Sequence, residues 1–293
     1  MLTDTELKSF LLSLQKIKGI DLSSYRKNFL RRRLQYCMQS RDVKDFCVYL
    51  DILNKDPAEY KKFLDNLSIN VTEFFRDADV FEQVRNVCLK DIIKRKSLSG
   101  SKVIRAWSMA CSSGQEAYSL AILIKEELKS VPEDFLVRIW GTDIDNDALE
   151  TAKKAQYPLK SLKTIDSQLV KEYFYPVDTE GQGKEINAQA RSFISLHPQE
   201  RLYQVTDTIR KQISFVRHDF ITEPALKFMD LIFCRNVMIY LEKQGIESLF
   251  KKFYNALSTN GYLVIGKTEG LRVDLEELFV PVDLNKKIFQ KRR

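Results

Sequence analysis

The sequence predicts an α/β protein in which a helical bundle precedes a parallel-sheet domain with a small inserted β subdomain. Residues 1 to about 90 show helix patterns throughout, and residues 103–123 then form a strand, a loop of small residues and a helix. Two later apolar stretches, 135–141 and 229–234, are typical of buried strands and end in polar residues. Strands that alternate with helices favour a parallel sheet covered by helices.

Length and composition are those of a folded globular protein. The chain has 293 residues, enough for one large domain or two modest ones, and it is 44% hydrophobic and 30% charged. Lys and Arg number 47 against 40 Asp and Glu, which gives a net charge of +7. This surplus suits an acidic partner, which could be nucleic acid, an anionic membrane surface or an acidic protein face.

Cysteine and histidine usage argues against a disulfide framework and against a metal site. The five cysteines include no Cys-x-x-Cys pair, and the only histidines are His197 and His218, which we expect on the surface or in loops. The N-terminus has no signal-peptide pattern, and no run approaches ~18 apolar residues. We therefore expect a cytoplasmic protein with free thiols and no membrane insertion.

Residues 1–90 are expected to form an N-terminal helical domain. Thr3 or Asp4 can cap a first helix, and Ser23 or Ser24 can start a second. The second helix contains the densest positive patch of the chain, which comprises Arg26, Arg31, Arg32, Arg33 and Arg41. This patch is either a docking surface or a solvated face whose arginines pair with nearby acids.

A less regular stretch, residues 66–76, joins the bundle to the rest of the chain. Asn70, Thr72 and Arg76 place three hydrogen-bonding side chains around an apolar pair of phenylalanines. A helix end with an aromatic anchor would explain this pattern without a ligand. The linker-like sequence SLSGS at 97–101 then precedes the α/β part, and we expect the second domain to cover residues 91–293.

The strand, loop and helix of residues 103–123 predict a nucleotide-type pocket. Small residues up to Gly114 let the backbone bend at the carboxyl end of the strand, where open α/β sheets bind ligands. An ordinary βα unit explains the pattern equally well. Because a dinucleotide fingerprint needs three glycines and this loop has one, NAD binding is not favoured.

Asp143 and Asp145 follow the strand at 135–141. A carboxylate at this position can accept hydrogen bonds from both ribose hydroxyls. Asp143 lies 143 − 114 = 29 residues after Gly114, further than the ~20 of a dinucleotide site. Ribose binding ranks first, capping of the next helix second, and a divalent metal third.

Residues 151 to about 208 interrupt the alternation, and we expect an inserted subdomain at roughly 155–208, with a helix at 161–175 and a turn at 181–184. The alternation returns with strands at 213–216 and 229–234. The polar and aromatic residues that follow these two strands are Asp219, Phe220, Arg235, Asn236 and Tyr240. They should meet Gly114 and Asp143 at one sheet edge.

The C-terminal part predicts one more helix and the remaining strands. An amphipathic helix fits 246–257, a strand fits 262–265, and closing antiparallel strands fit 279–282 and 287–289.

Five motifs occur in a specific order: SINVTEFFRD (68–77), ACSSGQEAYS (110–119), GTDID (141–145), FCRNVMIY (233–240) and GYLVIGKTE (261–269). With them the chain resembles the CheR-type protein-glutamate O-methyltransferases, which modify chemoreceptors. The resemblance implies a Rossmann-like class I S-adenosylmethionine-dependent methyltransferase domain that forms glutamate methyl esters and S-adenosylhomocysteine without a metal.

The resemblance also implies roles for individual residues. Asn70, Thr72 and Arg76 are similar to linker residues that reach the cofactor. Glu116 is similar to an acid that helps hold it, and Asp143 to the acid that binds the ribose. With these residues at one edge, Gly114 is interpreted as leaving room for the nucleoside.

The later motifs imply the rest of the site. Asp219 and Phe220 occupy the place of an Asn-Leu type pair beside the adenine, and Arg235 and Asn236 resemble the pair after the fourth core strand. Tyr240 resembles the tyrosine that faces the transferred methyl group. We expect Tyr240 near the reacting oxygen and Arg76, the second catalytic candidate, mainly on the cofactor's carboxylate.

The expected partner is the acidic helical methylation region in the cytoplasmic domain of chemoreceptors, docked by Arg31, Arg32 and Arg33. The chain departs from the family at Lys267, where a His is usual, and in the stretch 175–202, which is longer than in familiar members. Two alternatives remain: a methyltransferase of RNA or a small molecule, and a cofactor-binding sensor or scaffold without transfer. Nucleic acid is not favoured, because the arginine patch lacks interleaved stacking aromatics.

Overall fold

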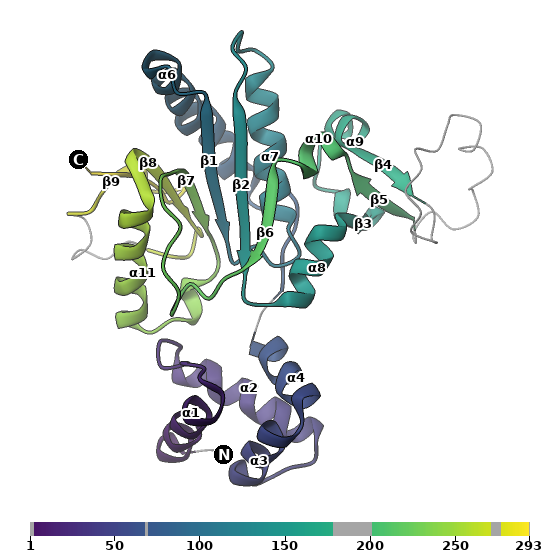
Figure 1. The fold of residues 1–293 in the computed structure, drawn as a ribbon, viewed down its shortest axis with the longest axis vertical. Helices are drawn as coiled ribbons and strands as arrows, with labels where there is room; N and C mark the ends of the chain where they lie inside the picture. The colour runs from purple at the N-terminus through teal and green to yellow at the C-terminus, as the bar shows by residue number, and fades with distance from the viewer. Residues whose placement is uncertain (1–2, 68–69, 178–200, 271–276, 293) are drawn as a thin grey trace.

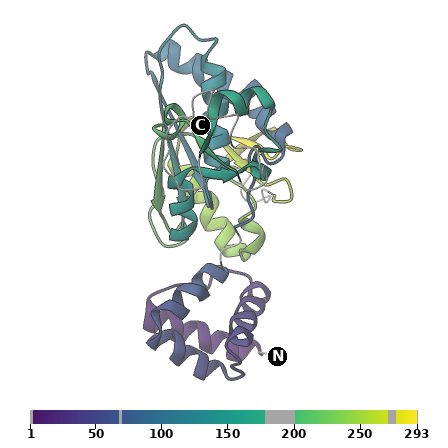
Figure 2. The ribbon, with the colours of Figure 1, turned by 90° about the vertical axis from the view of Figure 1, so that its right-hand side faces the viewer.

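The computed structural model describes residues 3–67, 70–177, 201–270 and 277–292, and these form a helical domain next to a sheet domain (Figures 1 and 2). The helical domain consists of α1 (Asp4–Lys18), α2 (Lys27–Ser40), α3 (Phe46–Lys55) and α4 (Pro57–Leu67). Thr3 and Glu6 form a capping box that starts α1, and Gly19, at φ +71°, ends it. Leu7, Phe10 and Leu14 of α1 are buried in the core of this domain.

A helical segment follows the linker and packs on the sheet. It runs through α5 (Ala78–Gln83), a π-helical turn η1 (Val84–Leu89) and α6 (Lys90–Ser99). Its buried side chains lie in the same core as those of β1 (Val103–Met109) and α7 (Gln115–Leu128). Because of this packing, we propose that the second domain begins before α5, and not at residue 91 as the sequence indicated.

The main sheet has seven strands in the order β6-β2-β1-β7-β8-β10-β9. Besides β1, these strands are β2 (Leu136–Asp143), β6 (Ile213–Arg217), β7 (Met229–Cys234), β8 (Leu257–Ile265), β9 (Phe279–Asp283) and β10 (Ile288–Lys291). The pairs β6·β2, β2·β1, β1·β7 and β7·β8 are parallel, and β10 is antiparallel to β8 and β9. The strand order reverses between β1 and β7, and ligands bind beside such a switch point.

Alternating side chains of the central strands supply two cores. Leu231 and Phe233 of β7 face the core shared with η1 and α7, while Ile232 and Cys234 face the core shared with α11 (Lys243–Ala256). This period of two is typical of a strand covered on both faces. The predicted mixed architecture is therefore confirmed.

The inserted β subdomain follows α8 (Asn146–Lys154). Its antiparallel sheet has the order β3-β5-β4, formed by β3 (Gln156–Pro158), β5 (Leu202–Val205) and β4 (Phe174–Val177). The remaining short elements are η2 (Leu159–Leu162), α9 (Ser167–Tyr173), α10 (Asp207–Arg210) and η4 (Met238–Tyr240). The helix expected at 161–175 is shorter than predicted, and the turn expected at 181–184 and His197 lie outside the described residues.

Among the described helices, none is both long and apolar enough to span a membrane.

Candidate functional site

A cavity of about 440 Å³ lies where the helical domain meets the carboxyl ends of β1, β2 and β7. The helical domain is next to these strand ends in the ribbon (Figure 1). Residues of both domains border the cavity, and so does the linker between them. Of the candidate site residues, the cavity is bordered by Asn70, Thr72, Arg76, Glu116, Asp143, Asp219, Phe220, Arg235, Asn236 and Tyr240.

Asp143 is buried at the end of β2 and holds the loop that follows β1. Its Oδ2 accepts a hydrogen bond of 2.8 Å from the backbone N–H of Ser112, and its Oδ1 accepts one of 3.0 Å from that of Asp145. Burial raises the pKa of Asp143, although these backbone donors oppose the shift. Each carboxylate oxygen has a second lone pair, so Asp143 can still accept hydrogen bonds from a ligand.

Asp145 caps the helix that follows it, a role that ranked second in the sequence analysis for the pair Asp143 and Asp145. Its Oδ1 accepts hydrogen bonds of 2.9 and 3.0 Å from the N–H groups of Asp147 and Ala148 and thereby caps α8. No group of three or more metal-ligating acids, cysteines or histidines occurs in the described part of the chain.

Gly114 shapes the loop but does not border the cavity; Ala110, Cys111 and Ser112 of the same loop do. Gly114 has φ +93°, and a Cβ added to it would lie 2.8 Å from the Cβ of Ala152 on α8. Its missing side chain therefore permits the turn and the approach of α7 to α8.

The linker residue Asn70 connects the loops that follow β1 and β2. Its Nδ2 donates to Asp145 Oδ2 at 2.6 Å, and its Oδ1 accepts from Ser112 Oγ at 3.1 Å. Further along, Arg76 Nη1 donates to the carbonyl of Val71 at 3.0 Å. Thr72 borders the cavity, and no described residue forms a hydrogen bond with its hydroxyl. The irregular stretch is thus part of the cavity wall.

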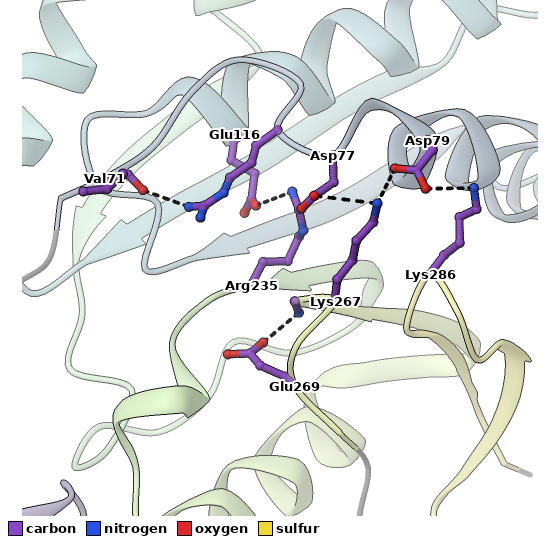
Figure 3. Close-up of polar contacts among 10 residues, drawn as sticks. Val71, Asp77, Asp79, Glu116, Arg235, Lys267, Glu269 and Lys286 are labelled. Carbon is purple, nitrogen blue, oxygen red and sulfur yellow. Dashed lines mark hydrogen bonds and ion pairs between the residues drawn. The ribbon is translucent and has the colours of Figure 1, made fainter.

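Arg235, directly after β7, is buried between two carboxylates (Figure 3). Its Nη2 contacts Asp77, and its Nη1 lies 3.4 Å from Oε2 of Glu116. The Nε atom is buried without a hydrogen-bond partner among the described residues. Glu116 also accepts from Ser108 Oγ at 2.8 Å, and burial raises its pKa while Arg235 opposes that rise.

Lys267 extends this ion-pair network away from the cavity. Its Nζ lies 2.7 Å from Asp79 Oδ1 and 3.7 Å from Asp77 Oδ1, and Lys286 Nζ lies 3.0 Å from Asp79 Oδ2. These lysines lower the pKa of Asp79 to about 2. The residue that departs from the family pattern therefore ties the turn after β8 to the start of α5 (Figure 3).

The turn after β7 is fixed by Glu269, a residue of the GKTE motif to which the sequence assigned no role. Its carboxylate accepts hydrogen bonds of 2.7 and 2.8 Å from the backbone N–H groups of Gly266 and Met238. Asn236 adopts φ +61° in this turn. The ring of Tyr240 follows, with its centroid 4.9 Å from that of Phe29 on α2. Tyr240 thus lies at the contact between the two domains.

Asp219 and Phe220 border the cavity after β6. Asp219 Oδ1 accepts from the N–H of Ile221 at 2.9 Å, and its Oδ2 accepts from Thr222 Oγ1 at 2.7 Å, so this carboxylate mainly organises its own turn. Lys252 of α11, which sequence reasoning missed, donates to the carbonyls of Phe220, Ile221 and Glu223 at 2.6 to 2.9 Å. These bonds hold the backbone of the turn after β6. The sequence could not indicate this role, because Lys252 is about thirty residues from the carbonyls that it binds.

The three arginines proposed for docking lie on α2, and none borders the cavity. Arg31 pairs with Asp4 of α1 and donates to Asn28 at 2.9 Å. Arg33 lies over the ring of Phe29, with its guanidinium carbon 5.6 Å from the centroid. Arg32 is exposed, and within the described part of the chain its one hydrogen bond, of 3.3 Å, goes to the backbone carbonyl of Asn28. Arg31 therefore fits the alternative of pairing with a nearby acid, and Arg32 is the most available of the three.

Both parts of the chain match models of one family. Residues 5–68 match its all-alpha domain, and residues 70–200 and 195–288 match its SAM binding domain. The chemotaxis protein methyltransferase of Listeria innocua is 30% identical over 272 residues, which cover 92% of this chain and 92% of that relative. The chemotaxis protein methyltransferase of Borreliella burgdorferi is 29% identical over 275 residues, which cover 92% of this chain and 90% of that relative. That of Escherichia coli is 28% identical over 274 residues, which cover 92% of this chain and 85% of that relative. The chain therefore belongs to the CheR methyltransferase family.

Proposed function

We propose that this protein transfers the methyl group of S-adenosylmethionine to glutamate side chains of chemoreceptors, forming glutamate methyl esters and S-adenosylhomocysteine. One observation carries the proposal. Residues of four of the five motifs, all except 261–269, border a single cavity at the carboxyl edge of the sheet, in a chain whose relatives are named chemotaxis protein methyltransferases.

The cavity residues fit the chemistry of this cofactor. A volume of about 440 Å³ is within the usual range for small-molecule sites. The carboxylate of Asp143 can accept from ribose hydroxyls, and the buried wall at Phe220 suits a flat base. The unpartnered Nε of Arg235 and the guanidinium of Arg76 are donors for the amino-acid carboxylate of the cofactor.

The linker and α7 would hold the remaining groups of the cofactor. Asn70 and Thr72 reach the cavity from the linker, while Glu116 can accept from the cofactor's ammonium. Asn236 borders the cavity beside Arg235 and presents an amide. Asp219 can still accept from an exocyclic amine, although its oxygens already bond within their own turn.

Methyl transfer to a carboxylate needs alignment more than proton transfer. When bound, the cofactor supplies the methyl group on a sulfonium sulfur. The attacking glutamate has an ordinary pKa of about 4.3 and is already ionised near neutral pH, so the protein needs no general base or metal to activate it. Its residues therefore act by holding the reacting oxygen in line and by electrostatic complementarity.

Tyr240 and Arg76 are the residues we assign to this alignment. The Tyr240 ring is fixed against Phe29, so its hydroxyl can orient the reacting carboxylate. A close ion pair between Arg76 and that carboxylate would stabilise the nucleophile and slow its attack. We therefore place Arg76 mainly on the cofactor's own carboxylate.

The proposed partner is the acidic helical methylation region in the cytoplasmic domain of a chemoreceptor, so the reaction belongs in the cytoplasm. The net charge of +7 favours approach of an acidic surface. Arg32 is exposed on α2, in the domain that also contributes to the cavity. We propose α2 as the docking face, with Arg32 as its main contact, Arg33 beside it and Arg31 held by Asp4.

The test is incubation of the protein with methyl-labelled S-adenosylmethionine and three acceptors: membranes with chemoreceptors, membranes without them, and RNA. Base-labile label on protein only with receptor membranes supports the proposal. Label on RNA would support a different substrate, and binding of the cofactor without transfer would indicate a sensor or scaffold. Either of those two results contradicts the proposal.

A further inference from the structure

Tyr25 belongs to the helical domain, but its backbone is bound to the sheet domain. It lies between α1 and α2 and forms an isolated antiparallel bridge with Leu241. On either side of it, the N–H of Arg26 donates to the carbonyl of Tyr240 at 2.8 Å, and the carbonyl of Ser24 accepts from the N–H of Glu242 at 2.8 Å. Tyr25 is therefore held in a fixed place relative to the cavity.

Tyr25 is one of the residues of the helical domain that border the cavity. Its ring stacks on Phe29, with centroids 6.1 Å apart and an interplanar angle of 25°. Burial raises the pKa of its hydroxyl, and the carboxylates of Asp219 and Asp143 raise the pKa further. The phenol thus stays protonated at neutral pH, and its hydroxyl has no hydrogen-bond partner among the described residues.

Tyr25 borders the same cavity as Asp143 and Asp219, which lie at the end of β2 and just after β6. Asp143 and Asp219 would repel a substrate carboxylate, so the methyl acceptor does not belong beside them. A nucleoside is neutral, with hydroxyls that pair with carboxylates and a flat base that packs on aromatic rings. A neutral phenol adds a donor that the two carboxylates cannot supply.

We propose that Tyr25 forms the wall of the nucleoside end of the site, its ring contacting the nucleoside and its hydroxyl donating to it. The inference rests on the proposed binding of S-adenosylmethionine. The nucleoside site is then built by both domains, so cofactor affinity depends on how the helical domain is docked. The same domain carries α2, so cofactor binding and receptor docking share one structural unit.

The test is calorimetric titration of the full chain and its variants with S-adenosylhomocysteine and with 5′-methylthioadenosine, which lacks the amino-acid end. Tyr25→Ala should weaken both ligands by about tenfold or more, as expected for loss of an aromatic wall. Tyr25→Phe, which keeps the ring and its packing on Phe29, should lose about fivefold through the missing hydrogen bond. The matched control is Tyr36→Ala on α2, where Tyr36 is 58% exposed; its affinity should stay within twofold of the wild-type value.

Three results would overturn the inference. An affinity of Tyr25→Ala within twofold of wild type would remove the ring from the site, and an unchanged affinity of Tyr25→Phe would remove the hydroxyl. A loss with S-adenosylhomocysteine but none with 5′-methylthioadenosine would exclude the nucleoside end. If the wild-type chain itself bound neither ligand, the proposed function would fail, which is a distinguishable result.

Discussion

Lys267, in the turn after β8, donates a hydrogen bond of 2.7 Å to the carboxylate of Asp79 near the start of α5. The two residues are 188 positions apart in the chain. Asp79 and its neighbour Asp77 lie on the segment that supports Arg235, so a lysine at the family's usual histidine position is part of the framework behind the cavity. Mutations can separate the contributions of the individual ion pairs to the free energy of unfolding.

Lys267→Ala should have a small effect and Asp77→Ala a large one. Lys267 is 38% exposed, and exposed ion pairs contribute at most about 1 kcal/mol. Removal of Asp77 leaves the buried Arg235 with Glu116 alone, which should lower the free energy of unfolding by about 2–4 kcal/mol. Urea unfolding of both variants measures the difference; equal effects would disprove this ranking.

The stabilisation by Asp79 should disappear in acid. Its folded-state pKa of about 2 lies below its ordinary value of 3.8. The contribution is therefore complete above the unfolded pKa and is lost as the pH falls from about 5 towards 2. The difference in urea midpoint between wild type and Asp79→Asn should shrink over this range. A difference that does not change with pH would exclude the proposed ion pairs as its source.

Asp143→Ala should mainly weaken cofactor binding. It removes the proposed acceptor for the ribose and releases the backbone of Ser112, so the affinity for S-adenosylhomocysteine should fall by about 10- to 100-fold. Asp143→Asn keeps one acceptor oxygen and should lose less. Asp147→Asn, at an exposed position on α8, serves as the control. Undiminished affinity of the alanine variant in calorimetry would remove Asp143 from the site.

Tyr240→Phe should lower turnover by about 10- to 100-fold while changing the affinity for S-adenosylhomocysteine by less than twofold. The ring keeps its contact with Phe29, so the substitution removes only the hydroxyl, which we propose orients the acceptor. Single-turnover rates and calorimetry separate the two quantities. Equal losses in rate and affinity would argue against the role assigned to Tyr240.

Arg32→Glu should slow methylation several-fold at low ionic strength and weaken its dependence on salt, because Arg32 is exposed on the proposed docking face. Lys8→Glu on α1 makes the same change of charge at another exposed position and is the control. Initial rates over a series of salt concentrations provide the measurement. Similar rates for the two variants would show that overall charge, and not this face of α2, attracts the receptor.

The sheet and one edge of the site could be predicted because local patterns determine them. The apolar run at 103–109, the small residues up to Gly114 and the helix after it are consecutive in the chain, and the structure has them as β1, a tight loop and α7. Topology then brings Asp143 and Arg235 to the same edge, since the carboxyl ends of parallel strands meet there.

The helical wall of the cavity could not be predicted in the same way. Tyr25 reaches the cavity only because its backbone pairs with Leu241, more than two hundred residues later. Similarly, the sequence left open whether Arg31 docks a partner or pairs with an acid, because its partner, Asp4, lies on another helix. From the sequence, Gly114 is interpreted as leaving space for a ligand. In the structure, the space that a side chain would need is occupied by Ala152.

The most direct test of the proposed function is tandem mass spectrometry of chemoreceptor peptides after reaction with the protein and S-adenosylmethionine. The expected result is a single methyl group on glutamate side chains of the cytoplasmic methylation region, lost on mild base treatment and strongly reduced with Tyr240→Phe. Receptor peptides without methyl ester after reaction with an enzyme that binds the cofactor would contradict the account.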